Sequence, residues 1–182
     1  DAITSTQTQL DVERTEKSLT ELNSKTALVA LGQTDVQQVS LPASSSSTYR
    51  IDEDAGGQSR ISDDDYVEGP PELIVEIAHS SAAYDLHDKK RAYRRNGVQE
   101  YLVWQIEEAQ VDWFASEGGA YLSLSPDEDG QIESRTFPGL VLDVDALLSD
   151  NFDTVLAALQ EQTGTERHQA FVEQLAHQDD ED

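Results

Sequence analysis

The apolar residues in the second half of the chain fall into short runs, and each run predicts a β-strand. The run ELIVEIA (72–78) is rich in β-branched residues and lies between a proline and two serines, which is typical of a buried strand. Three further runs follow, separated by short turns, and predict consecutive strands: EYLVWQI (100–106), QVDWFAS (110–116) and AYLSLS (120–125). Extended segments are expected again within 132–144.

Helical spacing is clearest between the first two of these strands, in residues 84–96. Leu86 and Tyr93 lie seven positions apart on one face, and Gly97 is placed to end the helix. Two more helices are predicted at about 151–161 and 165–177. A strand, a helix and then several strands predict an α/β (α+β) fold, a mixed β-sheet flanked by helices, with further helices at the C-terminus.

The N-terminal part of the chain gives weaker signals. A short strand is predicted at 26–32, and the serine-rich run 43–48 is interpreted as a loop or linker. Residues 62–71 are interpreted as an acidic loop closed by two prolines. We therefore expect a divergent N-terminal segment at 1–45, one domain at 46–178 and an acidic tail at 179–182.

Charge adds a constraint on environment and partners. Twelve Lys and Arg stand against 37 Asp and Glu, which gives a formal net charge of −25. Halophiles use such acidic surfaces to keep proteins soluble, so we expect a salt-adapted cytoplasmic protein. No apolar run is long enough to span a membrane, and the absence of Cys excludes thiolate metal and redox sites. A body this negative repels phosphate at low salt.

Glu76 is the residue that the strand pattern does not explain. An ionised carboxylate inside a short apolar strand is costly unless it is paired or binds a cation. Alternation places Glu72 and Glu76 on one face about 13 Å apart, too far to share one ion without curvature or a third ligand. The alternative is an edge strand whose polar face meets water.

The run KKRAYRR (89–95) is the second feature without an obvious structural role, because it holds five of the twelve basic residues. One interpretation is a solvated helix whose cations lie toward its C-terminus. The other is a positive patch where a polyanion docks, with one lysine turned toward Glu76. Helical spacing does not choose between Lys89 and Lys90 for that role.

Other candidates for chemistry are weaker. The strand aromatics Trp104, Trp113 and Phe114 are interpreted as core rather than as a stacking surface. His79 directly follows the first strand and is interpreted as structural or solvated, and His87 is expected on the exposed helix face. No glycine-rich phosphate loop, nucleophile elbow or HExxH pattern occurs.

The run GPPELIVEIAHSSAAYDLHDKKRAYRRNGVQEYLVW (69–104) resembles the Uma-two family, restriction-endonuclease proteins with a PD-(D/E)XK nuclease-like domain. The resemblance continues through DWF (112–114) and FPGLVLDVDALL (137–148), and it covers about 50–176. It implies a restriction-endonuclease-like mixed sheet within 46–178. The implied activity is that of a metal-dependent endonuclease, which hydrolyses DNA phosphodiester bonds.

The resemblance also implies a catalytic set of Glu76, Lys89 and Glu72. Glu76 matches the central acid of the motif, and Glu72 matches a commonly acidic position before the strand. The lysine is expected on the following helix, where Lys89, four residues after Asp85, fits the pattern. The implied cofactor is Mg²⁺ or Mn²⁺, held by Glu76, Glu72 and the backbone carbonyl of Ile77. The other cations of the run are then the candidates for nucleic-acid binding: Lys90, Arg91, Arg94 and Arg95.

The sequence departs from the family at the first metal ligand, and the family's early acidic helix is not recognisable in residues 1–45. The first metal-ligand Asp of the family would fall near Ser45 and Ser46, and Asp52 has the right parity but lies about 20 Å further along an extended chain. A site with one strong carboxylate should bind Mg²⁺ poorly. The alternative function is therefore a catalytically inactive module that binds nucleic acid or a protein partner through the 89–95 helix. Whether the chain forms a homodimer stays open.

Overall fold

Six strands form the central sheet, in the order β1-β2-β5-β6-β7-β8. The computed structural model describes residues 36–40, 46–64, 66–78 and 85–178. The strands are β1 (Val36–Ser40), β2 (Ser46–Ile51), β5 (Leu73–Ala78), β6 (Glu100–Gln105), β7 (Gln110–Glu117) and β8 (Ala120–Leu124). The neighbours β5 and β6 run parallel and the other neighbouring pairs are antiparallel. The predicted mixed sheet is thus confirmed.

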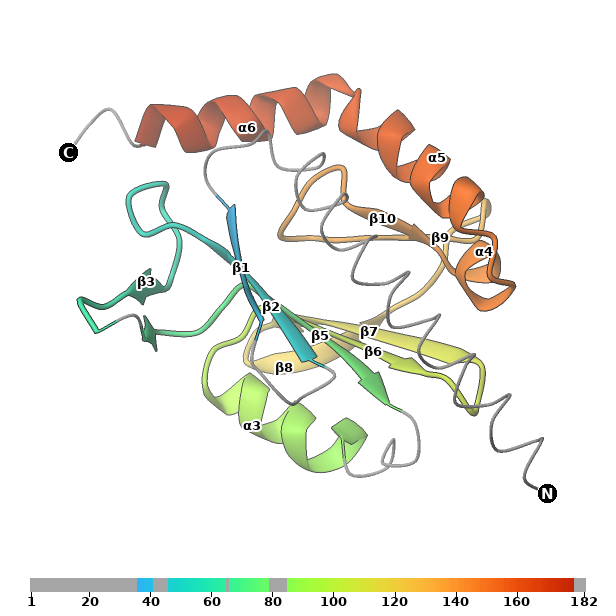
Figure 1. Cartoon of the computed structure of the whole chain (residues 1–182), viewed down its shortest axis with the longest axis horizontal. Coiled ribbons are helices and arrows are strands. Elements are labelled where there is room, and N and C mark those ends of the chain that lie inside the picture. Colours follow the sequence, from blue (N-terminus) through green and yellow to red (C-terminus); the bar gives the residue numbers. More distant parts are fainter. Residues whose placement is uncertain (1–35, 41–45, 65, 79–84, 179–182) are drawn as a thin grey trace.

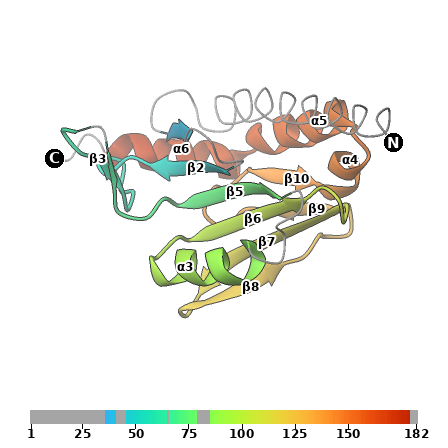
Figure 2. The same cartoon turned by 60° about the horizontal axis from the view of Figure 1, so that its bottom comes forward.

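Helices lie on both faces of this sheet (Figure 1). Figure 2 shows α3 on one side and α4, α5 and α6 on the other. The helical elements are η1 (Asp85–Lys89, a π-helix), α3 (Lys90–Arg95), α4 (Val144–Leu148), α5 (Phe152–Thr163) and α6 (Glu166–Gln178). Two hairpins complete the fold: β3 (Arg60–Ile61) with β4 (Val67–Glu68), and β9 (Gln131–Glu133) with β10 (Val141–Asp143). Within the described part of the chain, no helix is both long and apolar enough to cross a bilayer.

Strand alternation divides the apolar core between the two faces of the sheet. On the face of the C-terminal helices, the core includes Leu73, Leu102, Trp113, Phe137 and Leu175. On the face of α3, it includes Ile74, Tyr101, Val103 and Phe114, with Tyr93 of α3 packed against them. The strand aromatics are buried, as the sequence analysis predicts for Trp104, Trp113 and Phe114.

The sequence predicts a loop at 43–48, and this expectation is wrong for residues 46–48, which belong to strand β2 (Ser46–Ile51). Strand β2 pairs with β5 on one side and with β1 on the other. Backbone hydrogen bonds to two neighbours stabilise an extended segment even where the side chains show no apolar pattern. Strand β4 likewise lies inside the predicted acidic loop 62–71. The strand predicted at 26–32 lies outside the described residues.

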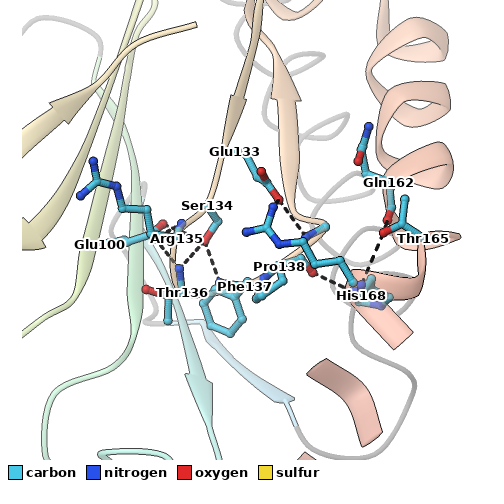
Figure 3. A network of polar contacts seen from close by, with 12 residues as sticks. Glu100, Glu133, Ser134, Arg135, Thr136, Phe137, Pro138, Gln162, Thr165 and His168 are labelled. Atoms are coloured by element: carbon cyan, nitrogen blue, oxygen red, sulfur yellow. Dashed lines mark hydrogen bonds and ion pairs between the residues drawn. The ribbon is translucent and has the colours of Figure 1, made fainter. Parts of the chain in front are cut away.

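The turn between β9 and β10 provides a test of how α6 is docked. Gly139 has φ +90°, and a Cβ at this position would lie 3.0 Å from the Nδ1 atom of His168. The Nδ1–H of buried His168 donates to the carbonyl of Pro138 at 2.8 Å (Figure 3). We expect Gly139→Ala to lower the free energy of unfolding by about 1–3 kcal/mol, measured in urea.

The control for this substitution is Gly118→Ala. Gly118 also has a positive φ, +59°, but a Cβ added there would meet no atom within 4 Å. We expect a loss of about 1 kcal/mol there, from the backbone conformation alone. Equal losses at the two glycines would show that the contact with His168 carries no part of the effect.

Candidate functional site

Glu76 lies in the interior of the sheet. Strand β5 is paired on both edges, and Glu76 stands opposite Ser46 on β2 and Val103 on β6. Its side chain is 2% exposed. The alternative of an edge strand with a water-facing polar side is therefore wrong, because β5 has no open edge. The carboxylate needs compensation from the protein itself.

Four side chains form what we call the Glu76 cluster: Glu76, Lys89, Tyr93 and Tyr101. The Nζ atom of Lys89 donates to both carboxylate oxygens, at 3.2 and 3.1 Å. The Tyr93 hydroxyl donates to Oε1 at 2.8 Å, and the Tyr101 hydroxyl donates to Oε2 at 3.0 Å. One cation and two hydroxyls thus offset the cost of burying this charge.

The helix after β5 explains why Lys89, and not Lys90, reaches Glu76. Lys89 is the last residue of η1 and Lys90 the first of α3, at the point where a wider helical turn passes into an α-helix. Lys89 points to β5, whereas the Nζ atom of Lys90 lies 3.2 Å from the centre of the Phe114 ring on β7. Partial burial there lowers the pKa of Lys90, partly opposed by Asp112.

The structure places Glu72, the second predicted carboxylate, in a different environment. Glu72 is buried just before β5, and its two oxygens accept the backbone N–H groups of Ile51 (2.7 Å) and Gln58 (2.9 Å). These bonds close the loop between β2 and β3. A catalytic or metal-binding role for Glu72 stays a prediction, since its described partners are backbone groups.

Glu100 is a third buried glutamate, and the sequence pattern does not single it out. Figure 3 shows its carboxylate beside the chain that follows β9. Its donors are Trp113 Nε1 (2.8 Å), Ser134 Oγ (3.0 Å) and the backbone N–H groups of Arg135 (2.6 Å) and Thr136 (2.8 Å). No cation is among these described donors. Glu76 therefore differs from Glu72 and Glu100, because its described partners are side chains alone and include a cation.

The described residues do not make a complete divalent-metal site on their own. Mg²⁺ takes oxygen ligands in a near-ideal octahedron, and no group of three Asp, Glu, His or Cys gathers among the described residues. Both Glu76 oxygens already accept hydrogen bonds. Ser46 stands across from Glu76, and the family resemblance expects the first metal-ligand Asp near Ser45 and Ser46. The carbonyl of Ile77 stays a predicted ligand, and His79 lies outside the described residues.

The other predicted residues lie on the outer side of α3. Arg91, Arg94 and Arg95 are exposed, and the Nη1 atom of Arg94 donates to the carbonyl of Gly119 at 2.6 Å. His87 is exposed, as expected. Asp52 pairs with Arg50 at 3.1 Å, on the loop beyond the end of β2.

Sequence reasoning misses the two tyrosines of the Glu76 cluster. It places Tyr93 only in an apolar stripe, although the spacing of four residues from Lys89 puts both on one helical face. Tyr101 lies on β6 beside β5, and no sequence signal distinguishes its hydroxyl from that of a core tyrosine.

Two clefts are lined in part by α3. One, of about 480 Å³, includes Ile74, Pro70 and Tyr93 and shares that tyrosine with the Glu76 cluster. The other, of about 460 Å³, includes Lys90, Arg91 and Arg94. The Glu76 cluster thus lies beside an open, mainly apolar groove, while the cations line a separate cleft.

A buried glutamate on an inner strand, paired with a lysine from the following helix within a mixed α+β fold, is consistent with a restriction-endonuclease-like protein. Residues 47–145 match the Uma2 family, described as "Putative restriction endonuclease". This match spans more than half of the chain, from β2 into α4, and the chain belongs to this family. The resemblance stated in the sequence analysis is thereby confirmed. None of the curated proteins compared matches the chain.

Proposed function

We propose that the protein is an endonuclease that hydrolyses DNA phosphodiester bonds at the Glu76 cluster. The observation that carries the proposal is the buried pair of Glu76 and Lys89, with Nζ–O distances of 3.1 and 3.2 Å, inside the part of the chain that matches the family. Membership of a restriction-endonuclease family favours DNA as the substrate.

Lys89 is the residue that can face both the protein and the substrate. Its side chain is 36% exposed although its ammonium contacts a carboxylate that is 2% exposed. A phosphate approaching from solvent would meet this ammonium, which offsets the negative charge that develops on the phosphoryl oxygens in the transition state. Tyr93 and Tyr101 hold the orientation of the Glu76 carboxylate.

A divalent ion, Mg²⁺ or Mn²⁺, is the proposed cofactor on the ground of the family. Glu76 and the carbonyl of Ile77 are the proposed ligands from this chain, with Glu72 as a further predicted ligand. When bound, such an ion polarises a phosphoryl oxygen and activates water. The described residues supply only part of a ligand set, so the metal requirement is a question for experiment.

We expect Lys89→Gln to reduce plasmid nicking by about 100-fold or more, because it removes the cation beside the proposed scissile phosphate. Initial rates on supercoiled plasmid would be measured with Mg²⁺, with Mn²⁺ and with EDTA. Because the chain carries a charge of −25, the assay is run over a range of salt up to high concentrations.

Arg60→Gln is the matched control, since Arg60 is an exposed cation outside the 89–95 helix. It removes the same charge and should retain most of the nicking rate. Nicking that is unchanged in Lys89→Gln would contradict the proposed site. Nicking that is absent from the wild type with either ion would favour the alternative, an inactive module that binds through the 89–95 helix.

The expected surroundings of the protein are proposals of the same kind. The excess of acidic residues supports a salt-rich cytoplasm as the working environment. A homodimer stays an open prediction, which the sedimentation of the purified chain would test.

A further inference from the structure

The cations of α3 differ from the other cations of the described chain in how they are paired. Outside α3 and η1, each described arginine has a carboxylate partner, at distances of 2.5 to 3.1 Å. These pairs are Arg50–Asp52, Arg60–Glu68, Arg135–Glu117 and Arg167–Glu133. Among the described residues, no carboxylate forms such a pair with Lys90, Arg91, Arg94 or Arg95. In a chain with three acidic residues for each basic one, unpaired cations in a cluster call for an explanation.

Three of these cations line one cleft, which we call the basic cleft. Lys90, Arg91 and Arg94 form its helical wall together with His87, and Asp112 and Tyr121 lie on the opposite wall. The cleft has a volume of about 460 Å³, which is within the range of pockets that hold small ligands or parts of larger ones. Arg95, which the sequence analysis groups with these cations as a candidate for nucleic-acid binding, is not among the lining residues, so it is not part of the site inferred here.

The basic cleft carries an excess of positive charge that its own residues do not neutralise. Asp112 is the one acidic residue among its described lining, and the side-chain amides of Gln105 and Gln110 already donate to its carboxylate. Lys90 is partly buried over the Phe114 ring, where a cation gains less from water. Three cations against one occupied carboxylate favour an anionic ligand.

The wall of the cleft is also held in place before any ligand arrives. The guanidinium of Arg94 donates to the carbonyl of Gly119, in the turn between β7 and β8. This bond ties α3 to the opposite wall and leaves further N–H groups of Arg94 for a ligand, since a guanidinium carries five. Arg91, which is exposed, brings a second planar guanidinium suited to bidentate contact with phosphate oxygens.

We propose that the basic cleft binds a phosphate group of the DNA backbone at a different nucleotide from the one held at Glu76. This inference rests on the proposed function, which makes DNA the substrate. Glu76, Val103 and Asp112 stand side by side on three adjacent strands. Two strand spacings separate the first from the last, about 10 Å. The cleft and the Glu76 cluster therefore contact the DNA at two points. Lys89 lies at one of these points and Lys90 at the other.

The test compares Arg91→Gln with Arg95→Gln, two exposed cations on one helix that differ in whether they line the cleft. Binding of a short fluorescein-labelled DNA duplex is followed by fluorescence anisotropy at several salt concentrations, with EDTA present so that no cleavage occurs. We expect Arg91→Gln to raise Kd about tenfold at low salt. The affinity for DNA should also fall less steeply with salt: the magnitude of the slope of log K for binding against log salt concentration should decrease by about 0.9, which corresponds to the loss of one phosphate contact. Arg95→Gln should change Kd by less than about twofold.

Equal affinities in the two variants would overturn the inference, because the charge of the helix as a whole would then explain binding. A second arm separates DNA from a small free anion, which offers the same phosphate chemistry. In titration calorimetry with inorganic phosphate, heat that Arg91→Gln abolishes, together with unchanged DNA affinity, would assign the cleft to the free ion and overturn the inference. DNA affinity that depends on Arg91 supports it.

The outcomes also separate this inference from the proposed function. If the wild type does not nick plasmid but its DNA affinity depends on Arg91 and not on Arg95, the proposed activity fails and the phosphate site stands. If nicking depends on Lys89 while both arginine variants bind DNA equally, the phosphate site fails alone. Urea midpoints of unfolding close to that of the wild type would show that both arginine variants are folded.

Discussion

Glu76→Gln is expected to lower the rate of plasmid nicking by about 100-fold or more, an effect as large as that expected for Lys89→Gln. The substitution keeps the size of the side chain and one oxygen that can accept from a tyrosine hydroxyl. It removes the negative charge that holds Lys89, whose Nζ lies 3.1 Å from Oε2. It also removes the carboxylate that we propose as a metal ligand on β5.

The control for Glu76→Gln is Glu108→Gln, in the exposed turn between β6 and β7. Both variants change the net charge by the same amount, so a difference in nicking rate reflects position and not overall charge. If Glu76 and Lys89 act as one unit, the double variant should be no slower than the slower single variant. A nicking rate within about twofold of the wild type in Glu76→Gln would place the chemistry elsewhere.

Glu100→Ala is expected to cause the largest loss of stability, about 3–5 kcal/mol in the free energy of unfolding. Glu100 is completely buried. Without its carboxylate, the indole N–H of Trp113 and the backbone N–H of Arg135 lose their described acceptor, and the backbone N–H of Thr136 keeps only the Ser134 hydroxyl, at 3.2 Å. Buried donors left without an acceptor cost about 1–3 kcal/mol each. Urea unfolding followed by tryptophan fluorescence measures the difference.

Glu117→Ala is the control for Glu100→Ala, because Glu117 contacts the side chain of Arg135 at the protein surface. Glu117 accepts from the guanidinium of Arg135 at 2.6 Å, and both side chains are more than half exposed. An exposed pair of this kind contributes at most about 1 kcal/mol. The loss in the free energy of unfolding should therefore be much smaller for Glu117→Ala than for Glu100→Ala, because Glu117 is exposed and Glu100 is buried. Losses of similar size in the two variants would contradict this interpretation.

The elements after residue 72 could be predicted from the sequence because their side chains report their surroundings. The apolar run 72–78, the turn at Gly118–Gly119 and the helix end at Gly97 each have a local cause, and all appear in the structure. Strand β2 could not be predicted in this way. Its extended form depends on backbone pairing with β1 and β5. No local pattern of side chains reports that pairing.

The candidate site could be predicted only in part, for a related reason. A lone acid in an apolar strand is visible in the sequence, and so is a dense run of cations. The two tyrosine hydroxyls that complete the Glu76 cluster are not visible, because their role depends on where α3 crosses the sheet. Spacing also could not distinguish the buried glutamates, since the difference between Glu72 and Glu76 lies in their hydrogen-bond donors.

Ser46 stands across from Glu76 on a strand with a partner on either side. Strand pairing uses the backbone, so a serine at this position keeps β2 in the sheet without placing a second carboxylate beside Glu76, which would itself need compensation. The pairing of β2 and the charge that the site presents thus depend on different atoms of the same residue: the backbone of Ser46 holds the strand, and its side chain adds no charge beside Glu76.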